Sequence, residues 1–147
     1  MSNVHHLRKY MKRVSKNNRV DWKKAPDIKI RIIQIVNSLR INWVDTSRIY
    51  CFRSENSQSR AYARIWGLTK IWQLALSEKP GYIIEVLSER FDKLGRLEQD
   101  KVLLHELAHI PRNFSGSLLP HVRKRGKRNL EDRVRQLISL HKKTPRN

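Results

Sequence analysis

The sequence predicts an α+β fold in which a small β-sheet packs against one buried helix. Three short segments, at 49–52, 61–66 and 82–87, are rich in β-branched and aromatic residues and are bounded by turn-forming residues. They are followed by a run at 102–110 that is apolar on nearly every side of a helix, which is typical of a helix buried in a core. Strand segments followed by one buried helix indicate an α+β fold.

An amphipathic helix is predicted to precede these strands. Pro26 followed by Asp27 is a favourable helix start. From there, apolar residues recur at helical spacing, namely Ile28, Ile32, Ile35, Val36 and Leu39. The alternation over 28–32 also fits the start of a strand, but the later apolar positions keep the longer period and favour the helix.

Turn signals separate the strand segments. The polar run at 54–59 has turn composition, so the segments at 49–52 and 61–66 are expected to form a hairpin or a meander. The segment at 70–76 is compatible with either a helix or a strand. After a Pro-Gly turn signal, 82–87 is the clearest strand of the chain.

Two helices are expected in the C-terminal half. The first begins after Gly95 and ends close to Pro111, because proline disfavours helical angles at the residue before it. The second is capped by Asn129, with Asp132 at the capping-box position. Its buried stripe is expected to consist of Leu130, Val134, Leu137 and Ile138. His141, near the end of this helix, is expected to interact with its terminal carbonyls.

Positive charge is concentrated at the two ends of the chain. The 147 residues carry a formal net charge of +19. Residues 1–31 hold ten basic and two acidic residues, 112–147 hold eleven and two, and the centre holds eleven and nine. We therefore expect a basic N-terminal extension at 1–24 and a folded domain at 25–147 that ends in a basic helix. Such ends favour a polyanionic partner, and nucleic acid (DNA or RNA) is the first candidate.

The single cysteine and the hydropathy of the chain bear on its compartment. Cys51 has no partner for an intramolecular disulfide, which favours a reducing compartment. No apolar run approaches the length that spans a bilayer, and no apolar region follows the basic N-terminus as it would in a secretory signal. We therefore expect a cytoplasmic protein with no membrane partner.

A His-Glu-x-x-His motif, formed by His105, Glu106 and His109, lies on the predicted buried helix. Residues four apart lie on one helix face, so the two imidazoles can bind one ion. Glu106 lies about 100° around the helix from His105, where it can reach a water bound to that ion. The competing interpretation is a core helix whose histidines bond carbonyls. Burying three polar groups without coordination or hydrogen bonds would be costly, which favours the metal site.

A catalytic zinc usually has three protein ligands, so a third donor is expected. Metzincins place it six residues after the second histidine, and Ser115 occupies that position, which excludes that class. His121 is favoured, because the short Gly-containing loop before it can turn the chain back and limits how far it can lie from the motif. Glu131, Asp132 and His141 on the last helix are the alternatives.

Segment 48–121 resembles the phage- and archaeal-type metallopeptidases related to the SprT-like zincins. The resemblance rests on the runs at 59–65, 84–89 and 105–111, the loop 114–116 and the Pro-His pair at 120–121. It implies a minimal zincin (SprT-like) fold, with a small sheet over two core helices. It also implies Zn²⁺ bound by His105, His109 and His121, with Glu106 as the general base.

The expected function is therefore a zinc metallopeptidase that acts on a protein or peptide substrate. Some SprT-like relatives are proteases that act on proteins bound to DNA, and the basic ends fit such substrates. The alternative is a basic nucleic-acid- or ribosome-associated protein with an inactive zincin-like scaffold. Oxyanion stabilisation and phosphate binding are competing roles for four arginines, Arg60, Arg64, Arg112 and Arg123.

Overall fold

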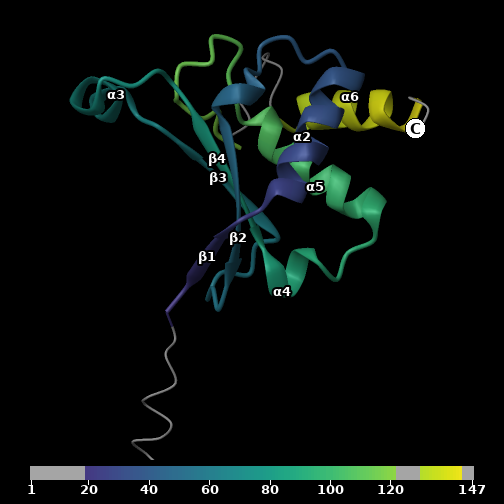
Figure 1. Ribbon diagram of the computed structural model, residues 1–147. Helices are drawn as coiled ribbons and strands as arrows, with labels where there is room; N and C mark the ends of the chain where they lie inside the picture. The colour runs from purple at the N-terminus through teal and green to yellow at the C-terminus, as the bar shows by residue number, and fades with distance from the viewer. Residues whose placement is uncertain (1–18, 122–129, 144–147) are drawn as a thin grey trace, which may run out of the picture.

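A four-stranded mixed β-sheet forms the centre of the fold, and helices α2, α5 and α6 lie on one side of it (Figure 1). The computed structural model describes residues 19–121 and 130–143. Within these residues the chain forms four strands and five α-helices. The predicted α+β class is confirmed.

The strands follow the spatial order β1-β2-β4-β3, which differs from their order in the sequence. Their bounds are Asp21–Lys24 for β1, Ile49–Glu55 for β2, Ala63–Gly67 for β3 and Tyr82–Leu87 for β4. β4 is parallel to β2 and antiparallel to β3, so the expected hairpin or meander of the first two predicted strands is wrong. β4 separates them because it is the most apolar strand, and a central position buries it on both faces.

The edge strand β1 lies within the segment 1–24 that we expected to be an extension. Its four residues pair antiparallel with β2, although all four side chains are exposed. Backbone hydrogen bonds rather than apolar burial hold this strand, which is why the hydrophobic pattern did not reveal it. Residues 1–18, the rest of the predicted basic extension, lie outside the described residues.

The two principal core helices confirm the sequence-based expectations. Helix α2, Pro26–Ser38, buries Ile28, Ile32, Ile35 and Val36. Helix α5, Arg96–Ala108, follows Gly95 and buries Leu103, Leu104, Leu107 and Ala108. His109 caps α5 and keeps helical backbone angles, so the helix ends within a residue of the expected position.

Three short helices connect the larger elements. A 3₁₀ turn at Thr46–Arg48 leads into β2, and α4, Ser88–Phe91, follows β4 directly. The ambiguous segment at 70–76 is helix α3, Lys70–Leu76, which connects β3 to β4 and lies beyond the ends of these strands, away from α2, α5 and α6 (Figure 1). No helix in the described ranges is long and apolar enough to cross a membrane.

Helix α6, Leu130–Lys143, confirms the predicted C-terminal helix. Leu137 is buried, and Val134 and Ile138 pack against the core. The predicted cap at Asn129 lies outside the described residues, as does the side chain of Leu130.

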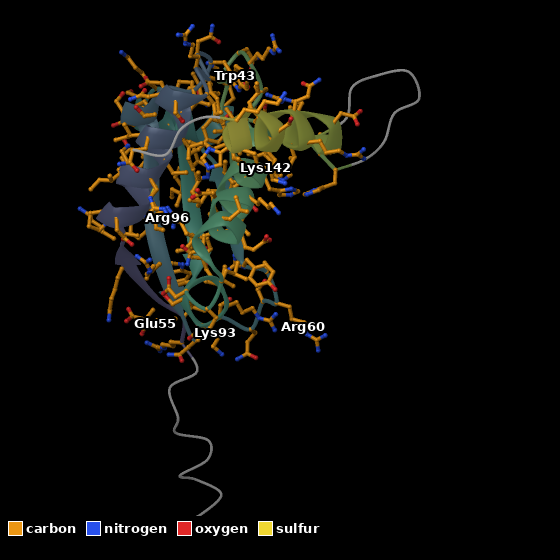
Figure 2. The ribbon with its side chains drawn as sticks, turned by 90° about the vertical axis from the view of Figure 1, so that its right-hand side faces the viewer. Trp43, Glu55, Arg60, Lys93, Arg96 and Lys142 are labelled. Carbon is orange, nitrogen blue, oxygen red and sulfur yellow. The ribbon has the colours of Figure 1, made fainter. Side chains whose placement is uncertain are left out.

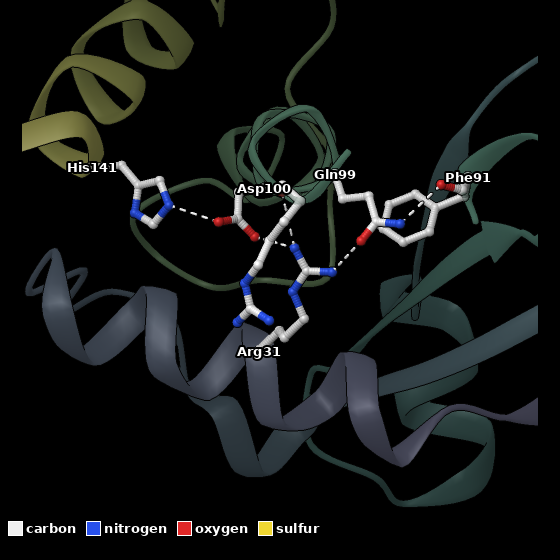
Figure 3. Close-up of polar contacts among 6 residues, drawn as sticks. Arg31, Phe91, Gln99, Asp100 and His141 are labelled. Atoms are coloured by element: carbon white, nitrogen blue, oxygen red, sulfur yellow. Dashed lines mark hydrogen bonds and ion pairs between the residues drawn. The ribbon is translucent and has the colours of Figure 1, made fainter. Parts of the chain in front are cut away.

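The predicted contact of His141 with helix-end carbonyls is wrong, because its Nε2 lies 2.9 Å from Oδ2 of Asp100 on α5. The other carboxylate oxygen of Asp100 accepts a hydrogen bond from Arg31 on α2 (Figure 3). These side chains are largely buried, so they join α2, α5 and α6 inside the molecule. A buried carboxylate needs a cation or hydrogen-bond donors to offset the loss of water. This need explains why the His141 side chain points to Asp100 rather than to the end of its own helix.

Candidate active site

The last turn of α5 carries the motif side chains next to one another. The imidazole rings of His105 and His109 have their centroids 5.2 Å apart, as expected for residues four apart on a helix. Glu106 and His109 are buried, and His105 is half-buried at the surface. The helix therefore presents two imidazoles and one carboxyl group within a single turn.

A loop after α5 turns the chain back toward these side chains, and Tyr82 on β4 holds it. The Tyr82 hydroxyl accepts a hydrogen bond from the backbone N–H of Gly116 and donates one to the carbonyl of Ser117, both at 2.8 Å. Gly116 has a φ of +91°, a conformation that favours glycine. A Cβ at Gly116 would lie 2.1 Å from the carbonyl oxygen of Leu68, so the loop also packs too closely for any side chain there.

Two hydrogen bonds connect the end of α5 to the returning chain. The N–H of Leu119 donates to the carbonyl of His109 at 2.8 Å. Nδ1 of His109 lies 2.6 Å from the carbonyl oxygen of Leu119. Because a carbonyl can only accept, Nδ1 carries the proton and Nε2 keeps its lone pair. This is the arrangement that metal-binding histidines usually have.

The returning chain brings His121 to the two motif histidines. Its ring centroid lies 5.0 Å from that of His105 and 4.4 Å from that of His109. The Nε2 atoms of His105 and His121 are 2.9 Å apart, and one ring nitrogen from each histidine lies within 4.8 Å of the others. The favoured third donor from the sequence is therefore next to the motif.

The spacing of these nitrogens fits a tetrahedral ion. Zinc–nitrogen bonds of about 2.0–2.1 Å at tetrahedral angles place two ligand nitrogens roughly 3.4 Å apart. The His105–His121 separation of 2.9 Å and the 4.8 Å that bounds all three separations lie on either side of this value. Three imidazoles also leave a fourth coordination position open, which is the composition of a catalytic rather than a structural zinc site.

The alternative third donors with described side chains, His141 and Asp132, do not join this cluster. His141 bonds Asp100, and Glu131 has no described side chain. Asp132 is described but is not in the cluster. In residues 19–121 and 132–143, the three histidines are the only group of three or more His, Cys, Asp or Glu side chains that can share one ion.

A cleft of about 420 Å³ adjoins the histidines and includes His105 and Glu106 in its wall. Strand β3 and the residues before it form one side, and α5 and α6 form the other. Most of its lining is apolar, including Ala61, Ala63, Val102, Val134 and Ile138. The cleft gives a ligand room beside the motif.

Comparison with known families agrees with this geometry. Residues 20–136 match the family described as "Putative phage metallopeptidase". The chain belongs to this family. The match covers β1 through half of α6 and includes all three clustered histidines. The family name indicates a hydrolase that uses a metal, and no curated protein or solved structure matches the chain.

Burial shifts the pKa values of two motif residues in this member of the metallopeptidase family, Glu106 and His109. Burial raises the pKa of Glu106 to about 7, so its carboxyl group can both accept and release a proton near neutral pH. Burial also lowers the pKa of His109, despite the hydrogen bond to Leu119. A neutral imidazole is the form that binds a metal ion.

Two of the candidate arginines, Arg64 and Arg112, make contacts outside the histidine cluster. Arg64 pairs with Glu85, and Arg112 lies over the Trp43 ring, 5.3 Å from its centroid. Arg60 extends into solvent at the opposite end of the molecule from Trp43 (Figure 2). Arg123 lies outside the described residues.

Leu119 and Tyr82, which position His109 and the returning loop, were not expected from the sequence. Leu119 acts through its backbone, and a backbone contact leaves no signal in side-chain patterns. Tyr82 was predicted only as part of a strand.

Proposed function

We propose that this protein is a cytoplasmic zinc metallopeptidase with a minimal zincin fold of the SprT-like type. The observation that carries the proposal is the convergence of His105, His109 and His121 within 4.8 Å, beside the buried Glu106. Membership of a metallopeptidase family supports the reaction class. The buried free thiol of Cys51 supports a reducing compartment.

The donor set favours zinc among the divalent metals. Three neutral imidazoles suit zinc and other transition metals, whereas magnesium and calcium prefer oxygen ligands. When bound, zinc would lower the pKa of a coordinated water and polarise the carbonyl of a peptide bond. His109 is prepared for this role, since its hydrogen bond to Leu119 directs the lone pair of Nε2 away from the loop.

Glu106 supplies the proton transfers in this proposal. Its carboxylate accepts a proton from the attacking water and then delivers it to the amine that leaves. A carboxyl group with a pKa of about 7 is suited to both steps, because neither form is strongly favoured. Glu106 follows His105 on α5, and both side chains line the same cleft. An attacking water in that cleft would lie next to the Glu106 carboxylate.

A peptide substrate would bind in an extended conformation along β3. Strand β3 pairs with β4 on one side only and is an edge of the sheet. The cleft lies against Ala61, Tyr62 and Ala63, at the start of this strand. Backbone hydrogen bonds to an edge strand can hold peptides of many sequences, while the apolar cleft wall selects side chains.

The test compares the cleavage of casein by the wild-type protein and by Glu106→Gln, with the zinc content of both measured. We expect equal zinc content and a loss of at least about 10³-fold in cleavage for the variant. Equal cleavage by zinc-loaded wild type and variant would contradict the proposal. Such a result would favour the alternative, a nucleic-acid- or ribosome-associated protein with an inactive scaffold.

Nucleic acid is a second proposed partner, and the net charge of +19 is the observation that favours it. The most basic segments, 1–18 and 122–129, lie outside the described residues. Binding to DNA or RNA should weaken steeply with salt, because each phosphate contact releases counterions. A chain lacking 1–18 should bind more weakly and show a smaller salt dependence. Equal affinity and salt dependence for both chains would contradict a role for this segment.

A further inference from the structure

Helix α3 buries a polar side chain and exposes its large apolar ones, the reverse of an ordinary surface helix. Its one buried residue is Gln73, at 5% exposure. The apolar side chains face solvent, with 75% of Ile71, 57% of Trp72, 69% of Leu74 and 54% of Leu76 exposed. A surface helix normally buries its apolar stripe and exposes its polar side chains. A concentrated exposed apolar surface of this kind marks a binding site.

Internal polar contacts hold α3 in this orientation. Nε2 of Gln73 donates to the carbonyl oxygens of Leu68 at 2.7 Å and Ser115 at 2.8 Å. The left-handed conformation of Ser77, with a φ of 52°, ends the helix. Because the polar side of α3 is fixed to the body of the protein, the apolar side is held outward.

The apolar surface of α3 covers a wide arc of the helix. At about 100° per residue, its exposed apolar side chains cover an arc of roughly 200°. The apolar stripe of a surface helix that packs on one neighbouring surface is at least about 100° wide, so the arc of α3 is broader than one such contact requires. A fluid apolar phase can surround a wider arc, and Trp together with Leu is typical of helices that lie in a membrane interface.

The residues next to α3 carry more basic than acidic groups. Lys70 and Lys79 flank the helix and are exposed. Arg48 lies over the Tyr50 ring and forms an ion pair of 3.5 Å with Glu78, the acidic residue next to Lys79. The local balance is therefore positive, as is the chain as a whole. The like charge disfavours pairing of α3 with a second copy and favours an anionic surface.

We propose that α3 is a docking element for an anionic lipid bilayer, inserted into the interface without spanning it. Figure 1 shows α3 beyond the ends of β3 and β4, at an extremity of the molecule away from the core helices, so it can reach a flat surface. Apolar insertion and positive charge together supply the two signals that stable peripheral binding needs. The expectation of no membrane partner considered only spanning segments, and docking requires far fewer residues. The proposal does not depend on the hydrolytic activity.

The test measures sedimentation of the full chain with phosphatidylcholine vesicles that contain about one third phosphatidylglycerol, compared with pure phosphatidylcholine. We expect binding to the anionic vesicles, which the double variant Ile71→Ser, Leu74→Ser weakens at least about tenfold. Ile30→Ser is the matched control, because Ile30 is 57% exposed on α2, and it should bind like the wild type. All variants should keep the wild-type midpoint of thermal unfolding.

Tryptophan fluorescence gives a second measurement of insertion. The emission of the wild type should shift to shorter wavelength with anionic vesicles, and Trp72→Phe should remove most of that shift. Vesicle binding that the double variant does not weaken would overturn the proposal, since the basic ends alone would then account for it. The proposal would also be overturned if the wild-type protein did not bind the anionic vesicles, or if it dimerised through α3.

Discussion

His109 and Leu119 are joined by two hydrogen bonds that run in opposite directions. The Leu119 N–H donates to the His109 carbonyl, and the His109 imidazole donates back to the Leu119 carbonyl. The first bond fixes the returning chain two residues before His121, and the second fixes the tautomer of His109. One pair of residues therefore positions two of the three candidate ligands.

Replacing Leu119 with proline tests this relationship, because proline lacks the N–H that bonds His109. We expect Leu119→Pro to lower the zinc affinity by about ten- to a hundredfold, as the loss of outer-shell contacts generally does. Competition with a coloured chelator measures the affinity. Leu119→Ala keeps both backbone groups and is the control, with an expected change of less than about threefold. Equal affinities for the two variants would show that the returning chain is positioned in another way.

The loop that leads to His121 should be intolerant of a side chain at Gly116. Its φ is +91°, and a Cβ would lie 2.1 Å from the Leu68 carbonyl oxygen and 2.5 Å from Nε2 of Gln73. We expect Gly116→Ala to lower the free energy of unfolding by at least about 2 kcal/mol, measured in urea. Gly95→Ala is the control, with no heavy atom within 4 Å of its Cβ and an expected cost below about 1 kcal/mol. Similar costs for both variants would contradict the packing described for this loop.

The buried contacts of Asp100 should stabilise the packing of α6 on α5. Asp100→Ala leaves the buried guanidinium of Arg31 without its carboxylate, and removing one partner of a buried pair costs about 3–5 kcal/mol. Glu98→Ala, on the same helix, removes only an exposed contact with Lys101 and should cost less than about 1 kcal/mol. Urea unfolding of both variants measures these costs, and a cost for Asp100→Ala as small as that for Glu98→Ala would contradict the account.

Glu85 should make the stability of the fold depend on acidic pH. Burial alone would raise the pKa of Glu85, but hydrogen bonds from Arg64 and Trp66 outweigh it and lower the pKa below the ordinary 4.5. Because the pKa of Glu85 is lower in the folded than in the unfolded protein, the ionised carboxylate adds stability at pH values above the unfolded-state pKa. That stability is lost as the pH falls through the folded-state pKa.

The corresponding measurement is urea unfolding of the wild type and of Glu85→Gln at neutral pH and at several values below 4.5. The free energy of unfolding of the wild type should fall relative to that of the variant as the pH falls, because Glu85 becomes protonated and glutamine does not titrate. A difference between the two proteins that stays constant with pH would contradict a lowered pKa at this carboxyl group.

Local patterns in the sequence predicted the helices and most strands but not how the strands pair. The spacing of Ile28, Ile32 and Ile35 determines which face of α2 is buried, so it is visible in the sequence. The insertion of β4 between β2 and β3 depends on contacts between distant segments, and the run at 54–59 resembles an ordinary turn. The approach of His121 to the motif could be expected because it follows a short loop. The pairing of His141 with Asp100 could not, since it joins residues on two different helices.

A zinc titration of the wild type, His121→Ala and His141→Ala tests the three-histidine site most directly. We expect one zinc per wild-type chain, an affinity at least about a hundredfold lower for His121→Ala, and no more than about a threefold change for His141→Ala. Unchanged zinc affinity in His121→Ala would contradict a site formed by His105, His109 and His121.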